Sequence, residues 1–130
     1  MKIEILDLEF TVCKVAGSEG VDRDAPFTFR GMTDAENSLV CPTERVPAGT
    51  LAREDGWRGM RVAGKLDFAL IGIMARISSA LAAAGIGLFA VSTFDTDYVF
   101  VKAGNLERAL DALARAGFEI GGGRKQEERR

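Results

Sequence analysis

The sequence predicts an α+β protein whose second half forms a ferredoxin-like βαββαβ module, preceded by a mostly β half. Residues 1–60 are rich in turn residues and in alternating polar and apolar positions. In residues 61–120, two long segments have apolar side chains at every third or fourth position, with strand-like segments around them. The resulting order of elements, β-α-β-β-α-β, is that of the split βαβ unit. We therefore predict domains at 1–60 and 61–120, followed by a flexible charged tail at 121–130.

The first half is expected to be built from strands and loops. Residues 6–13 alternate apolar and polar side chains, which is typical of a half-buried strand. Residues 17–26 are rich in Gly, Asp and other polar residues, so they are expected to form a loop. Residues 27–32 and 38–41 are expected to pair as a hairpin across an intervening turn. Residues 48–57 are expected to be a loop with at most one helical turn.

The second half begins with a short strand and a long helix. Residues 59–63 are expected to form the strand. Apolar side chains then recur at helical spacing over residues 70–84, after Asp67, which is expected to cap the helix. Gly85 follows the last periodic position and is expected to end the helix, because glycine adopts the left-handed conformation at little cost.

A hairpin and a second helix complete the module. Residues 87–94 and 98–102 are expected to be paired strands, with a tight turn at 95–97. Asn105 is expected to cap the second helix, which Gly117 ends before a last short strand. The buried stripe of this helix is expected to contain Leu106, Ala109, Leu110, Leu113 and Ala116.

Composition excludes several classes of function. The chain of 130 residues has 17 Lys+Arg and 19 Asp+Glu, a balance unlike the basic face of a nucleic-acid-binding protein. It contains no histidine, which excludes Ser-His-Asp and Cys-His catalysis and most zinc sites. Cys13 and Cys41 are expected to be buried thiols in a reducing compartment. Residues 77–93, which contain no charged side chain, fall short of a membrane span. We therefore expect a cytoplasmic protein without metal, cofactor, catalytic residue, nucleic-acid partner or membrane partner.

Three segments of the second half resemble an ACT domain. They are residues 66–77, residues 81–86 and residues 89–98, and the most specific part is the run Ser-Thr-Phe-Asp-Thr-Asp-Tyr at 92–98. More closely, they are similar to small bacterial ACT-domain proteins related to the CASTOR arginine sensors and to aspartokinase regulatory domains. The resemblance covers about residues 59–120, and residues 1–60 resemble the degenerate N-terminal ACT-like half of these proteins.

The resemblance implies a binding site for an amino acid between two ACT modules, and no catalytic residues. A helix N-terminus offers N–H groups to a carboxylate, and acidic side chains near a neighbouring strand turn can hold an ammonium group. In the related proteins the ligand contacts the helix start and the turn after the second strand, and a hairpin strand of the partner module closes the pocket. Carried to this sequence, these contacts are Ile71, Gly72, Thr93, Phe94 and Asp97, with Ser38 and Leu39 from the partner module.

Several residues in and beside this predicted site also have a structural explanation. Asp67 is a good helix cap, and Asp95 and Asp97 are common turn residues. Gly72 could serve only to let the helix approach a neighbouring element. The Asp95–Asp97 pair could also bind Mg²⁺, although no phosphate-binding loop accompanies it.

The sequence leaves two main functional hypotheses. The first is an amino-acid-binding regulatory module, and the second is a ligand-free structural or protein-interaction module; a small enzyme ranks last. We also expect a homodimer, because the first helix carries a second face of small residues that the module itself does not need to cover. That face consists of Gly72, Ala75, Ser79, Ala82 and Ala83.

Overall fold

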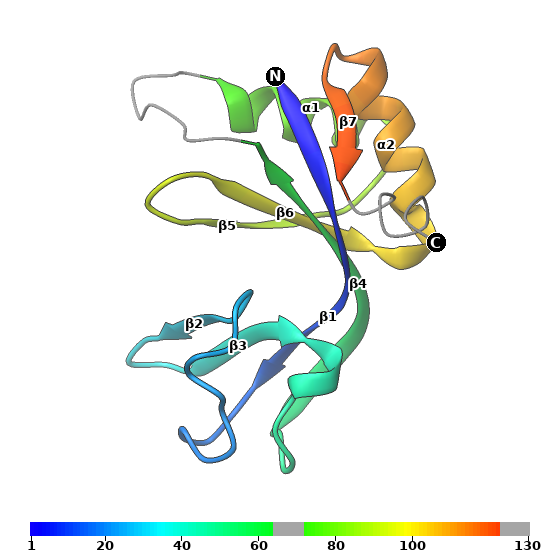
Figure 1. The fold of residues 1–130 in the computed structure, drawn as a ribbon. Helices are drawn as coiled ribbons and strands as arrows, with labels where there is room; N and C mark the ends of the chain where they lie inside the picture. The colour runs from blue at the N-terminus through cyan, green and yellow to red at the C-terminus, as the bar shows by residue number, and fades with distance from the viewer. Residues whose placement is uncertain (64–71, 123–130) are drawn as a thin grey trace, which may run out of the picture. The chain divides into compact units, whose positions relative to one another are not determined.

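The computed structural model describes residues 1–63 and 72–122, which form two compact units (Figure 1). Unit 2 is Leu8–Trp57, and unit 1 consists of Met1–Asp7 and the described residues from Arg58 onward. Two long strands, β1 (Lys2–Lys14) and β4 (Ala52–Val62), contribute residues to both units. The domain boundary was predicted at residue 60. The sequence analysis did not predict that Met1–Asp7 belong to the same unit as the second half of the chain.

Unit 1 has the predicted order of strands and helices. Its strands lie in the order β7-β1-β4-β6-β5, so the first residues of β1 lie between β4 and β7. Ile3 and Ile5 of this segment are buried in the core of unit 1, which explains why Met1–Asp7 belong there. The mixed α/β, ferredoxin-like class predicted from the sequence is confirmed. The remaining elements are α1 (Ile73–Ala83), β5 (Phe89–Ser92), β6 (Asp97–Lys102), η2 (Ala103–Asn105), α2 (Leu106–Arg115) and β7 (Glu119–Gly122).

Both helices pack on one face of these strands. The shared core contains Ile77 and Leu81 of α1, Leu110 and Leu113 of α2, and Val101 of β6. Ile77, Leu81 and Val101 have 0% of their surface exposed. The helical spacing of the apolar residues therefore predicted most of the buried positions of both helices. Ala116 was wrongly expected on the buried stripe of α2: it follows the last residue of the helix and is exposed, and Ala112 is buried instead.

The helix ends confirm the predicted glycines but not the predicted cap of α2. Gly85 and Gly117 have φ of 74° and 102°, in the left-handed region. Each ends its helix in a Schellman motif, in which the N–H of Ile86 donates to Leu81 O at 2.9 Å and that of Phe118 to Leu113 O at 3.0 Å. Asn105 is the last residue of η2 and makes no capping hydrogen bond. Its Oδ1 instead accepts a hydrogen bond from Arg108 at 3.0 Å.

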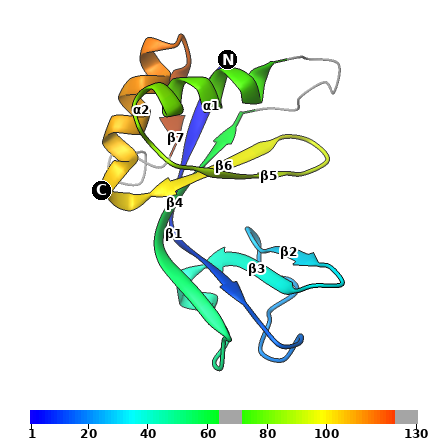
Figure 2. The same cartoon turned by 180° about the vertical axis from the view of Figure 1, so that it is seen from behind.

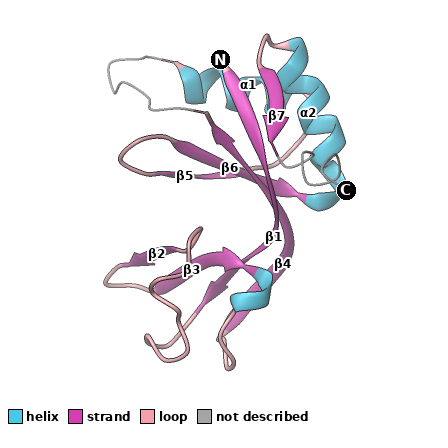
Figure 3. Ribbon diagram, viewed as in Figure 1, coloured by secondary structure: helices cyan, strands magenta, loops and turns pink. Residues whose placement is uncertain are grey.

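Unit 2 has the strand order β2-β3-β1-β4 (Figure 3). The predicted hairpin is present as β2 (Phe29–Met32) and β3 (Asn37–Pro42), and η1 (Thr43–Arg45) follows it. Among the described residues, unit 2 contains no α-helix; the segments between β1 and β2 and between β3 and β4 are loops and the single turn of η1.

The loop predicted at residues 48–57 is wrong, because β4 begins at Ala52. The sequence gives little sign of a strand here, since Ala52–Asp55 are exposed and mostly charged. The strand forms because β1 is available to pair with it. The buried Thr11 hydroxyl of β1 also donates a hydrogen bond to Asp55 Oδ1 at 2.7 Å.

The two hairpins repeat one another with a constant spacing of 60 residues. Phe29 begins β2 and Phe89 begins β5, Asn37 begins β3 and Asp97 begins β6, and η1 and η2 follow at the same spacing. The turns share their hydrogen bonds: Thr33 N–H donates to Glu36 O at 2.9 Å, and Thr93 N–H donates to Thr96 O at 2.8 Å. Unit 2 is therefore an internal repeat of the unit 1 hairpin, in which loops replace the helices.

The two cysteines are buried in the core of unit 2. Cys13 and Cys41 pack with Val15 and Leu39, and both are free thiols. Burial, with a smaller contribution from neighbouring Cys13, raises the pKa of Cys41 from 9.0 to about 11. Burial also raises the pKa of Cys13. Both groups are therefore protonated thiols at neutral pH, which makes them poor nucleophiles.

We predict that Cys41 resists labelling by an aromatic disulfide reagent at pH 8 in the folded protein. The rise in its pKa lowers the thiolate population about a hundredfold, and burial limits access as well. The stability that comes from keeping this thiol protonated is present below pH 9.0 and is lost as the pH rises toward 11. Absorbance measurements with and without urea test this, and native labelling as fast as in urea would contradict it.

We predict that Leu81→Ala lowers the free energy of unfolding by about 2–5 kcal/mol, because it leaves a cavity where α1 meets the strands. Leu51→Ala is the matched control. Leu51 is 63% exposed, so its truncation should change stability by no more than about 0.5 kcal/mol. Urea unfolding followed by circular dichroism compares the two, and equal losses would show that the core is not where we place it.

Candidate functional site

The predicted site begins at the N-terminus of α1. The helix begins at Ile73, and Gly72 precedes it as the N-cap residue with φ of 89°. Gly72 was expected inside the helix, on its face of small residues; instead it makes a left-handed turn that favours glycine. Arg76 N–H donates to Gly72 O at 2.8 Å, which closes the first turn. Ile71 and Asp67 lie outside the described residues.

The first turn of α1 leaves three N–H groups without a partner from the helix itself. The N–H groups of Ile73, Met74 and Ala75 precede the first helical hydrogen bond, so the helix supplies no carbonyl partner for them. Within residues 72–122, α1 has no acidic residue in its first turn and no side-chain cap. A carboxylate would be favoured at this positive end of the helix by about 0.3–1 kcal/mol.

The β5–β6 turn is fixed by the hydroxyl groups of two threonines. Thr93 Oγ1 donates to Thr96 O at 3.1 Å and accepts from Thr96 N–H at 3.4 Å. The buried Thr96 hydroxyl donates to Val62 O at 2.7 Å. This bond holds the turn beside the end of β4, the strand that precedes α1 in the chain. The turn and the first residues of α1 lie at the same end of unit 1 (Figure 1, Figure 2).

Asp97 and Phe94 have different positions on this hairpin. Asp97 was expected in the turn, but it is the first residue of β6 and pairs with Ser92 across the hairpin. Ser92 Oγ donates to Asp97 Oδ1 at 2.6 Å, which orients a half-buried carboxylate. Phe94 is 81% exposed at the tip of the turn. Its phenyl ring therefore adds apolar surface to the exposed tip of the hairpin.

Ser38 and Leu39 belong to unit 2. Ser38 Oγ donates to Glu36 Oε1 at 2.8 Å, so its hydroxyl already has a partner. Leu39 has 1% of its surface exposed and packs in the same core as Cys13 and Cys41. A ligand could therefore reach Leu39 only through its backbone. The structure brings Thr93, Phe94 and Asp97 together in one hairpin, and it places Gly72 in the same unit.

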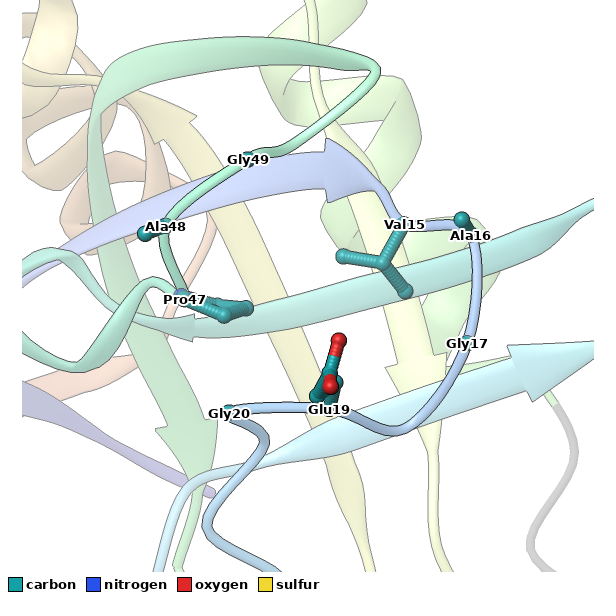
Figure 4. Close-up of a pocket in the computed structure, with 8 residues that line it drawn as sticks. All are labelled: Val15, Ala16, Gly17, Glu19, Gly20, Pro47, Ala48 and Gly49. Carbon is teal, nitrogen blue, oxygen red and sulfur yellow. The ribbon is translucent and has the colours of Figure 1, made fainter.

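Two pockets in unit 2 were not expected from the sequence. One, of about 270 Å³, lies between the loops at residues 15–20 and 47–49, and the Glu19 side chain points into it toward Val15 (Figure 4). The other, of about 650 Å³, lies between the end of β1, the β2–β3 turn and Leu51. No sequence motif marks either pocket, because both arise where loops replace the helices of the repeat.

The described residues contain neither a cluster that could hold a metal ion nor a helix that could cross a membrane. In residues 1–63 and 72–122, no three acidic or cysteine side chains gather closely enough to hold a metal ion. Within the same ranges, no helix has the length and apolar character that crossing a bilayer requires.

Comparison with known proteins identifies the family. A model described as the ACT domain matches residues 52–115, from the first residue of β4 to the last of α2. The chain is 29% identical over 121 residues to the rat protein named cytosolic arginine sensor for mTORC1 subunit 1. The match covers 87% of this chain and 37% of that protein, so the chain spans little more than a third of the curated relative.

Solved structures share the fold. A crystal structure of a protein from Agobacterium tumefaciens is 33% identical, with a TM-score of 0.80 over 92% of this chain and 90% of that one. The ligand-free regulatory subunit of aspartate kinase from Thermus thermophilus has a TM-score of 0.63 at 13% identity, over 90% of this chain and 98% of that one. At this identity the likeness is one of fold. The chain therefore belongs to the ACT-domain family, with sequence similarity to an arginine sensor and the fold of aspartate kinase regulatory domains.

Proposed function

We propose that this protein is a cytoplasmic regulatory module that binds a free amino acid in unit 1 and catalyses no reaction. Membership of the ACT-domain family supports a regulatory role, and the curated relative is named as an arginine sensor. The absence of histidine and the raised pKa values of both cysteines support the absence of nucleophilic catalysis.

The observation that carries this proposal is the anchoring of the β5–β6 turn to the end of β4. The bond from Thr96 to Val62 O holds the turn beside the strand that leads toward α1. The ligand's carboxylate would accept hydrogen bonds from N–H groups at the start of α1, with Ile71 and Gly72 contributing backbone contacts. Its ammonium group would pair with Asp97, whose carboxylate Ser92 already orients.

The ligand would be enclosed by a second copy of the chain. Phe94 at the turn is 81% exposed, and Ala75, Ser79, Ala82 and Ala83 form an exposed face of small residues on α1. Both features suit a symmetric interface between ACT modules. The backbone of Thr93 and the ring of Phe94 would then contact the ligand from one side, and Ser38 and Leu39 of the other copy would approach from the opposite side.

We predict that Asp97→Asn weakens amino-acid binding about ten- to a hundredfold, because the charge-assisted bond to the ammonium group contributes about 1.5–3 kcal/mol. Asn keeps a hydrogen-bond acceptor for Ser92, so the hairpin should stay folded. Asp95→Asn, an exposed neighbour, should bind almost as the parent does. Calorimetry with L-arginine, followed by the other amino acids, measures the affinities.

Two results would contradict this assignment. If both variants bind like the parent, Asp97 does not hold the ammonium group. If no amino acid at millimolar concentration raises the melting temperature of the parent protein, the ligand-free structural role is correct. A ligand at a hundred times its dissociation constant should add about 2.7 kcal/mol to stability, which a melting curve readily detects.

We predict that the protein in solution has twice the 14.0 kDa mass of one chain. Ala82→Arg on the exposed face of α1 should shift the equilibrium toward the monomer, because it places a charged side chain in the proposed interface. Asp111→Arg, on an exposed position of α2, is the matched control. Light scattering after gel filtration measures both, and a monomeric parent at high micromolar concentration would contradict the prediction.

A further inference from the structure

We propose that unit 2 holds a second amino-acid site, in the pocket beside the β2–β3 turn, and that this site takes an amino acid with an apolar side chain. The inference rests on the proposed function and extends it from one site per chain to two. It is carried by the internal repeat, by the pocket itself and by the side chains that line it.

The repeat places this pocket beside the counterpart of the unit 1 turn. Thr33 Oγ1 donates to Glu36 O at 3.4 Å and accepts from Glu36 N–H at 3.1 Å, the same two bonds that Thr93 makes with Thr96. Val15 N–H donates to Asn37 O at 2.9 Å, which holds the start of β3 beside the residue that follows β1. In unit 1 the bond from Thr96 to Val62 likewise holds the turn beside the end of β4.

The pocket carries groups of both charges. Its lining includes Lys14 at the end of β1 and Asp34 in the turn. Within residues 1–63 and 72–122, neither side chain makes a hydrogen bond or an ion pair. Lys14 can therefore pair with the carboxylate of an amino acid, and Asp34 with its ammonium group. Glu36 is less available, because its Oε1 accepts the hydroxyl of Ser38.

The apolar part of the lining selects the class of side chain. Met32 is 68% exposed and Leu51 is 63% exposed, and both line this pocket. An aliphatic ligand side chain would remove part of this apolar surface from water, which contributes about 25 cal/mol per Å². A volume of about 650 Å³ accommodates such a ligand.

Two other positions in unit 2, the Asn37 position and the pocket of Figure 4, are less suited to bind an amino acid. At the position equivalent to Asp97 the repeat has the neutral Asn37, whose Oδ1 accepts a hydrogen bond from Arg30 at 3.1 Å. Asn37 therefore carries no negative charge for the ligand's ammonium group, and a different acidic residue is needed. The adjoining pocket of Figure 4 contains Glu19 but no lysine or arginine in its lining, so it lacks a partner for a carboxylate.

Calorimetry of the full chain with L-leucine tests the proposal. We expect Lys14→Gln and Asp34→Asn each to weaken leucine binding about tenfold or more, the loss of one charge-assisted bond. Two controls remove one charge each from exposed positions of unit 2 outside the pocket, Arg23→Gln for the lysine and Glu19→Gln for the acid; both should change the affinity by less than about twofold. The analogues 4-methylpentanoate and 3-methylbutylamine, which lack the ammonium and carboxylate groups respectively, should also bind about tenfold more weakly.

The variant Asp97→Asn separates this proposal from that for unit 1. If it removes arginine binding but leaves leucine binding unchanged, while Lys14→Gln does the reverse, the chain has two sites. If Asp97→Asn abolishes the binding of every amino acid and Lys14→Gln changes none, the unit 2 site is overturned and the unit 1 site stands. If only Lys14→Gln and Asp34→Asn matter, the unit 2 site stands and the unit 1 site falls. Leucine that does not bind at millimolar concentration, or binds equally to all variants, overturns the second site.

Discussion

The pairing of β1 with β4 is the constraint on which the rest of the structure depends. Each strand is long enough to serve both units, so neither unit could complete its sheet without them. In unit 1 the first part of β1 buries Ile3 and Ile5 beneath the helices. In unit 2 its last part carries Cys13 into a separate core and Thr11 into a hydrogen bond with Asp55. A change that weakened this pairing would therefore disturb both cores.

The two units contain the same type of hairpin, which is accompanied by two helices in unit 1 and by loops in unit 2. In unit 1, α1 and α2 bury one face of the strands in a continuous apolar core. In unit 2 the corresponding connections are loops with one turn of 3-10 helix. Two pockets lie at these loops and at the turn beside them. Where unit 2 has loops in place of helices, its surface is therefore concave enough to hold a small ligand.

The proposed chemistry uses binding groups that need no activation. Hydrogen bonds from backbone N–H groups, an oriented carboxylate such as Asp97 and an exposed ammonium such as Lys14 recognise charge without forming a covalent bond. The thiols of Cys13 and Cys41 could act as nucleophiles only as thiolates, and burial keeps both of them protonated. Under the proposed function, the module would act through the molecules that its ligand-bound form contacts, and the exposed Phe94 would take part in such a contact.

The sequence by itself determined the elements of unit 1, the hairpin of unit 2 and the ACT family. These follow from local signals: helical spacing around Leu81, glycines such as Gly85 after the helices, and the run at residues 92–98. Only the tertiary structure decided that Ala52–Asp55 form a strand, because that strand is stabilised by pairing with β1 and not by its own pattern. It also decided that Met1–Asp7 join unit 1 and that Lys14 and Asp34 line one pocket. Contacts between residues distant in the chain leave no periodic trace in the sequence, since each partner is compatible with many local conformations.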